Sequence, residues 1–92
     1  MSAGRWRQLK ITIESTSKMV TLVQHHEAGR HETPARVWQG ETESGIPVQV
    51  YVTRIAPEIP KNDPRQREFE RDLTRVADPR PEIAAIPLRL VI

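Results

Sequence analysis

The chain has 92 residues, of which 37% are hydrophobic, and its formal net charge at neutral pH is only +2. A single domain of this size buries only about 60 to 65% of the surface that its unfolded chain exposes, so we expect a thin core. The absence of cysteine excludes disulfides, thiolate nucleophiles and cysteine-ligated zinc. No apolar run approaches the roughly 18 residues of a membrane span and no signal-peptide pattern opens the chain, so we expect no membrane association and a cytoplasmic location.

The first third of the sequence predicts two strands and a loop. Residues 9–14 alternate strictly between apolar and polar side chains, which indicates a half-buried strand. The hydroxyl-rich residues 15–18 are typical of a turn, and residues 19–23 alternate again, so the pattern predicts a short antiparallel hairpin. The polar residues 24–33 have no apolar periodicity and are expected to form an exposed loop.

The clearest hairpin in the sequence joins residues 35–39 to residues 46–55. The connecting residues 40–45 include two glycines, which permit the positive φ angles of a hairpin loop. Pro47 cannot donate to a strand ladder, so we expect it at the start of the second strand or facing an edge. This pattern predicts a second antiparallel strand pair.

One helix is predicted, over residues 64–77. Asp63 is in the N-cap position, Pro64 in the first helical position, and Gln66 in the capping-box position. The apolar side chains recur at i, i+4 and i+7 on one narrow face, and they are Phe69, Leu73 and Val76. We expect this face to pack on the sheet.

Residues 87–92 alternate and predict a closing strand. The fold class that follows is α+β, an antiparallel sheet of four to five strands with one helix packed on one face. Residues 1–92 are expected to form a single α+β domain, with residues 1–8 as a flexible N-terminal segment. The sheet face away from the helix is expected to carry Thr12, Gln49 and Tyr51, with Trp38 as a further candidate.

Groups that could carry catalysis or bind a metal are sparse. His25, His26 and His31 form the only cluster that resembles metal ligands, but adjacent histidines point apart and no His-Glu-x-x-His motif is present, so a solvated loop is favoured. The other hydroxyls and carboxylates lack an activating base or an apolar pocket that would shift a pKa. We therefore expect no enzyme activity, no cofactor and no metal.

Arginine dominates the candidate binding residues, since 11 of the 14 basic residues are arginine. An aromatic ring between two arginines near the N-terminus can stack on a base while the arginines neutralise phosphates. Three arginines at i, i+4 and i+8 of the predicted helix form a like-charged ridge that an anionic partner would relieve. A solvated, salt-bridged helix surface and the arginine preference of a high-GC genome are the alternatives.

We expect Tyr51 to be an exposed aromatic contact and Trp38 to pack in the core or the sheet. The full set of candidate binding residues is Arg5, Trp6, Arg7, Tyr51, Arg67, Arg71 and Arg75.

Four segments of the chain carry a resemblance to a known group of proteins: residues 11–18, 34–40, 45–48 and 53–55. Through these segments, the sequence over residues 9–92 resembles a family of short proteins encoded in phages and prophages of proteobacteria. The resemblance implies a protein of the bacterial host cell. It further implies an inhibitor of host defence, acting by binding a protein complex or by sequestering a nucleotide signal.

The leading interpretation is therefore a non-enzymatic binding protein with a protein partner, which inhibits a host defence complex. We expect this binding protein to form a homodimer through its sheet edges or its second face. The alternative is a nucleic-acid or nucleotide-binding protein that uses the arginine and tryptophan residues. A metal-dependent hydrolase acting through the histidines is a third interpretation with less support.

Overall fold

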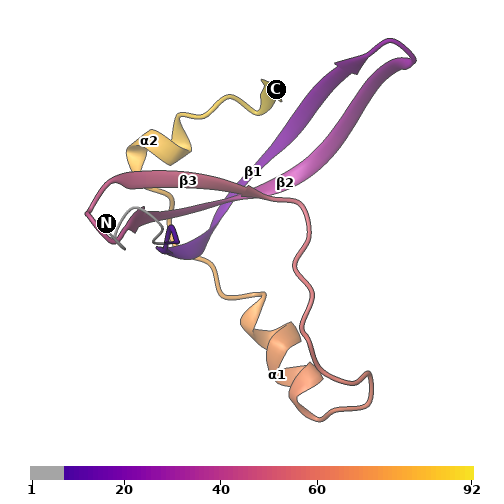
Figure 1. Cartoon of the computed structure of the whole chain (residues 1–92), viewed down its shortest axis with the longest axis vertical. Coiled ribbons are helices and arrows are strands. Elements are labelled where there is room, and N and C mark those ends of the chain that lie inside the picture. Colours follow the sequence, from indigo (N-terminus) through magenta and orange to yellow (C-terminus); the bar gives the residue numbers. More distant parts are fainter. Residues whose placement is uncertain (1–7) are drawn as a thin grey trace, which may run out of the picture.

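The computed structural model describes residues 8–92 and has a four-stranded sheet with two short helices (Figure 1). In chain order the elements are β1 (Ile11–His26), β2 (Gly29–Thr42), β3 (Pro47–Val52), α1 (Arg65–Asp72), α2 (Pro81–Ala84) and β4 (Arg89–Val91). The strand order across the sheet is β3-β2-β1-β4. Residues 1–7, which make up most of the predicted N-terminal segment, lie outside the part of the chain that the structure describes. Within residues 8–92, no helix is both long enough and apolar enough to cross a membrane.

Strand β1 is one continuous strand of 16 residues, so the predicted turn at residues 15–18 is wrong. Its pairing with β2 shifts register between Ser15 and Met19, which marks a β-bulge. The hydroxyl of Thr16 is fully buried there, donates to Val37 O at 2.6 Å and accepts from Lys18 N at 3.1 Å. The hydroxyl-rich stretch therefore satisfies the backbone of a bulge, and the chain continues in the same direction.

The predicted loop over residues 24–33 is also wrong, because these residues form the end of the long β1–β2 hairpin. The ladder continues to the pair His26 and Gly29, and Gly29 adopts a φ of 133° beside the turn. Every residue from Gln24 to Thr33 is exposed. A two-stranded ribbon with water on both faces needs no apolar alternation, so its strands give no periodic signal.

The predicted second hairpin is confirmed as β2 and β3. Thr42 N donates to Ile46 O at 2.9 Å, and Gly45 has a φ of 85° in the loop of residues 43–46 between the two strands. Gly40 lies in β2 and not in the loop. A Cβ atom at Gly40 would collide with the carbonyl oxygen of Thr12, so glycine allows the two strands to approach closely.

The closing strand is confirmed as β4, but the sheet is mixed and not purely antiparallel. Strand β4 pairs in parallel with β1 through Thr21 and Arg89, Leu22 and Leu90, and Val23 and Val91. After α1 the chain crosses one sheet face through α2 and then enters beside β1 in the same direction (Figure 1). A crossover of this kind produces a parallel neighbour, whereas a hairpin produces an antiparallel one.

The helix that packs on the sheet is α2, which the sequence did not predict. Ile83 in α2 is 2% exposed, and Ile86 just after it is 9% exposed. The buried cluster of the protein consists of Val20, Leu22, Ala35, Val37, Ile83 and Ile86, with Tyr51 and Leu90 packed against it. This cluster is thin, as the composition predicts.

Two of the three hydrogen bonds of the Gln39 side chain attach the segment before α2 to the sheet, and the third joins β2 to β1. Its Oε1 accepts from Arg80 N at 2.8 Å, and its Nε2 donates to Asp78 O at 3.2 Å and to Glu14 Oε2 at 3.1 Å. Gln39 is 5% exposed, so a buried polar side chain satisfies the backbone of the incoming segment. This contact fixes which face of the sheet α2 covers.

Helix α1 is shorter than predicted and does not pack on the sheet. It begins at Arg65, whose N–H donates to Asp63 Oδ1 at 2.8 Å, so the predicted cap is present. After Asp72 the hydrogen bonds tighten to i−3, and the Thr74 hydroxyl competes for Arg71 O. The helix itself buries no residue, and Figure 1 shows it at the end of an extended segment, away from the strands.

Candidate binding surface on the open sheet face

The two faces of the sheet differ in what covers them. We call the face that contacts α2 the closed face and the opposite one the open face. Strand alternation and register place Val37, Gln39 and Tyr51 on the closed face. The apolar side chains that the same alternation places on the open face are Ile11, Ile13, Met19, Val23, Trp38, Val48, Val50 and Val52.

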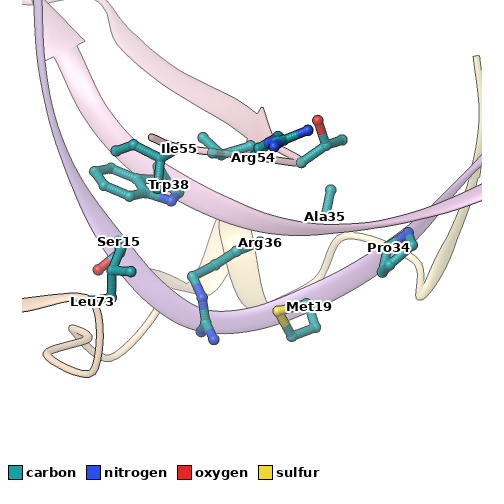
Figure 2. Close-up of a pocket in the computed structure, with 11 residues that line it drawn as sticks. Ser15, Met19, Pro34, Ala35, Arg36, Trp38, Arg54, Ile55 and Leu73 are labelled. Atoms are coloured by element: carbon teal, nitrogen blue, oxygen red, sulfur yellow. The ribbon is translucent and has the colours of Figure 1, made fainter. Parts of the chain in front are cut away.

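A hollow of about 270 Å³ lies on the open face, around Trp38 (Figure 2). Met19 borders it from β1, Val52 from β3 and Ile55 from the segment after β3, and Leu73 reaches it from the residue after α1. Met19 is 44% exposed, Ile55 47% and Leu73 41%. Large apolar side chains thus surround a tryptophan that is only half-buried, and water reaches most of them.

Two arginines border this hollow. Arg36 donates one guanidinium N–H to Thr16 O at 2.7 Å, and Arg54 is exposed at the end of β3. Within residues 8–92 neither arginine forms an ion pair, because the four ion pairs there involve Arg30, Arg65, Arg75 and Arg89. The hollow therefore combines an apolar floor with two cations that are available to a carboxylate.

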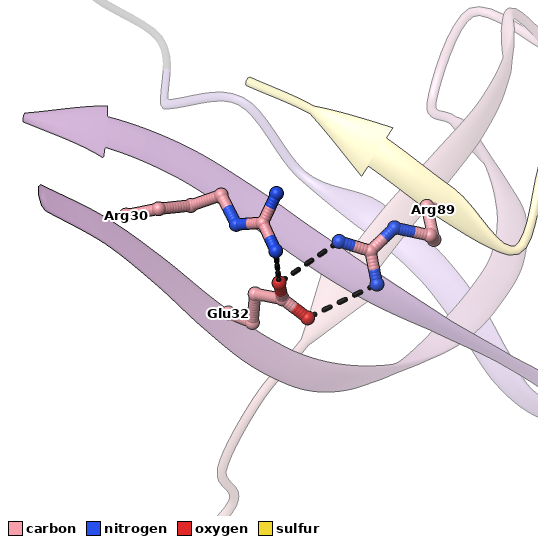
Figure 3. Close-up of polar contacts among 3 residues, drawn as sticks. All are labelled: Arg30, Glu32 and Arg89. Carbon is pink, nitrogen blue, oxygen red and sulfur yellow. Dashed lines mark hydrogen bonds and ion pairs between the residues drawn. The ribbon is translucent and has the colours of Figure 1, made fainter.

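An ion-pair cluster lies in the half of the β1–β2 hairpin that is nearer its turn (Figure 3). Arg89 of β4 forms a bidentate contact with Glu32 of β2, at 3.0 and 2.9 Å, and Arg30 approaches the same carboxylate at 2.7 Å. The hydrogen bond from Arg89 is the largest cause of the lowered pKa of Glu32, and that bond raises the pKa of Arg89. This cluster fastens β4 to the sheet, and both arginines in it already have a carboxylate partner.

The two aromatic residues of β2 and β3 are both half-buried and lie on opposite faces of the sheet. Tyr51 is half-buried on the closed face and packs against the buried cluster, so it is not the exposed contact that the sequence predicted. Trp38, expected to pack in the core or the sheet, lies in β2, is half-buried and lines the hollow on the open face. Gln49 lies with Tyr51 on the closed side of β3, so the expected assignment of the two faces is wrong.

The three arginines of the predicted helix are exposed but do not form one ridge. Arg67 and Arg71 lie on α1, while Arg75 lies beyond its last residue and approaches Asp72 at 3.6 Å. Residues 63–75 contain four arginines and four carboxylates. The charge of this segment is therefore balanced, which favours a solvated surface.

The remaining candidates lie elsewhere. Arg5, Trp6 and Arg7 lie outside the described residues. At the hairpin end, the rings of His26 and His31 meet edge to face with centroids 5.2 Å apart, and no group of three or more potential ligands in residues 8–92 is placed to hold a metal ion.

Comparison of this chain with protein-family models, with curated proteins and with solved structures found no match in any of the three. Its function is therefore argued from the two sheet faces themselves.

Proposed function

We propose that this protein is a non-enzymatic binding protein that takes up an apolar, acidic segment of a partner protein on its open sheet face. The observation that supports the proposal is the position of Trp38, half-buried in an apolar hollow that Arg36 and Arg54 border. Tryptophan and arginine are the residue types most enriched among those that dominate protein–protein binding energy. Apolar anchors of the partner would fill the hollow, and its carboxylates would pair with the arginines.

The size of the hollow favours a protein partner over a small molecule. Small-molecule pockets enclose roughly 300–1,000 Å³ and bury most of their ligand. The hollow on the open face measures about 270 Å³ and is shallow, with side chains around it that are 41 to 47% exposed. A site of this shape fits one or two side chains of a larger surface.

Site-specific cross-linking in cells tests the proposal. A photoreactive amino acid at position 19 on the open face should form a cross-link to one specific protein, whereas the same amino acid at position 27, in the hairpin turn, should not. Arg54→Glu should lower the yield because it opposes a carboxylate, and Arg67→Glu on α1 is the matched control. Equal yields from both positions, or no effect of Arg54→Glu, would contradict the proposal.

The resemblance to phage and prophage proteins suggests a particular partner. We propose that the cross-linked protein belongs to a host defence complex and that binding inhibits it. This requires that expression of the protein restores phage growth in a host carrying that defence. Restoration by a Trp38→Ala variant at the wild-type level would reject the open face as the inhibitory surface.

The alternative, a nucleic-acid or nucleotide binder, draws less support from the described residues because the charges around α1 are balanced. Backbone-driven nucleic-acid binding weakens steeply with salt. Oligonucleotide binding at low salt that falls steeply as salt rises would favour this alternative over a protein partner.

A further inference from the structure

Strand β3 is an edge strand of the sheet. Among residues 8–92, no strand pairs with it on the side away from β2. Its six residues, Pro47–Val52, include no charged side chain, whereas the opposite edge strand, β4, has only three residues and carries Arg89. Natural sheets protect free edges with charges, prolines or short strands. Pro47 protects only the first position of β3, so the remaining five residues leave a neutral edge that can pair with another chain.

The backbone groups that this edge offers follow from the hairpin. Thr42 N donates to Ile46 O, and hydrogen-bonded pairs recur every second residue, so Val48, Val50 and Val52 point their backbone groups toward β2. The backbone groups of Gln49 and Tyr51 therefore point outward. Two consecutive outward residues with both N–H and C=O groups are enough to begin a new ladder.

The surface area of the protein leaves room for such an interface. The chain exposes 7513 Å², whereas a compact protein of 10.6 kDa exposes about 5,500 Å². The radius of gyration is 16.5 Å, against about 12 Å for a compact chain of 92 residues. A standard interface buries about 800 Å² of each partner. The area that this protein exposes beyond that of a compact protein is more than twice as large.

We propose that two copies of this protein pair through β3 in an antiparallel ladder, with a twofold axis at Val50. Antiparallel pairing of one strand with itself satisfies a closed twofold symmetry, so the interface is self-complementary. The two sheets become one of eight strands, and the two open faces become one continuous surface. The dimer presents two copies of the Trp38 hollow to a partner.

The register follows from Pro47, which has no N–H to donate. With the axis at Val50, Gln49 of one copy lies opposite Tyr51 of the other, and both pairs exchange two hydrogen bonds. An axis at Gln49 would place Tyr51 opposite Pro47 and lose a donor in each pair. The Val50 register also brings valines together across the axis, a favourable cross-strand pair.

Single cysteines test this register, since the chain has no cysteine of its own. At the axis, Val50 and its copy form a non-hydrogen-bonded pair with Cα atoms about 4.5 Å apart, within the range of a disulfide. Val50→Cys should therefore form a disulfide-linked dimer under a mild oxidant, at least about tenfold faster than Val48→Cys, whose copy lies about 13 Å away. Equal rates for the two variants would overturn the register.

A proline in the edge tests the ladder itself. Gln49→Pro removes an outward N–H and leaves the bonds to β2 intact, so it should weaken dimerisation at least about tenfold with an unchanged far-UV circular dichroism spectrum. Gln49→Ala keeps the N–H and should remain a dimer by sedimentation equilibrium. A wild-type protein that is monomeric at every concentration would overturn the inference, and the cross-linking result at Met19 would be unaffected.

Discussion

The closed and open faces of this sheet are built from the same two hairpins and both carry rows of apolar side chains. On the closed face, Ile83 and Ile86 cover the valines and leucine of β1 and β2. On the open face, Met19, Trp38 and Val52 surround a hollow that water reaches. Strand alternation therefore determines which residues share a face, whereas the position of α2 determines which face becomes the hydrophobic core.

The largest expected effect comes from removing the cover of the closed face. Ile83→Ala deletes a side chain that is 2% exposed, which should lower the free energy of unfolding by about 2–5 kcal/mol. Val52→Ala, a half-buried position on the open face, should lower it by less than about 1 kcal/mol. Urea unfolding followed by circular dichroism measures both values. Equal losses of unfolding free energy would show that the two faces contribute equally to stability.

The second effect concerns the anchor that selects the closed face. Gln39→Leu leaves the part-buried Arg80 N–H without its acceptor, so we expect a loss of about 1–3 kcal/mol. Gln49→Leu changes an exposed glutamine on the same face and should be nearly neutral. If Gln39→Leu proved as stable as the wild type, packing alone would be holding α2 in place.

The third prediction separates binding from stability on the open face. Met19→Gln should change the free energy of unfolding by no more than about 0.5 kcal/mol, because the side chain is 44% exposed. The same variant should reduce cross-linking of a partner from a photoreactive group at position 54. Unchanged cross-linking would place the partner elsewhere on the molecule.

The smallest effect is a pH dependence of the ion-pair cluster. Arg89 lowers the pKa of Glu32 in the folded protein below its ordinary value of 4.5, so protonation favours the unfolded state. The contribution of Glu32 is complete at pH above that value and is lost as the pH falls through the lowered pKa. The difference in the free energy of unfolding between Glu32→Gln and the wild type should therefore become smaller as the pH falls. A difference that stays constant with pH would show that the ion pair does not cause it.

The second hairpin, the closing strand and the Asp63 cap could be predicted because each depends on local sequence. The alternation of residues 46–52, the glycine at position 45 and the acidic residue before proline act within a few residues. Their physics is the same in any tertiary context.

The features that decide the binding surface depend on contacts across the chain. Thr16 is part of a bulge because Val37 O, 21 residues away, accepts its hydroxyl. Gln39 fixes α2 on one face through Arg80, 41 residues away. Nothing near Trp38 or Tyr51 in the sequence reveals which of them α2 will cover, so the sequence wrongly predicts Tyr51 on the uncovered face.

Hydroxyl-radical footprinting of the free protein and of its cross-linked complex tests the central claim most directly, since methionine, tryptophan and tyrosine all react. We expect Met19 and Trp38 to react readily in the free protein and to become protected in the complex, while Tyr51 reacts weakly in both. A Trp38 that is as unreactive as Tyr51 in the free protein, or that keeps its reactivity in the complex, would contradict the central claim.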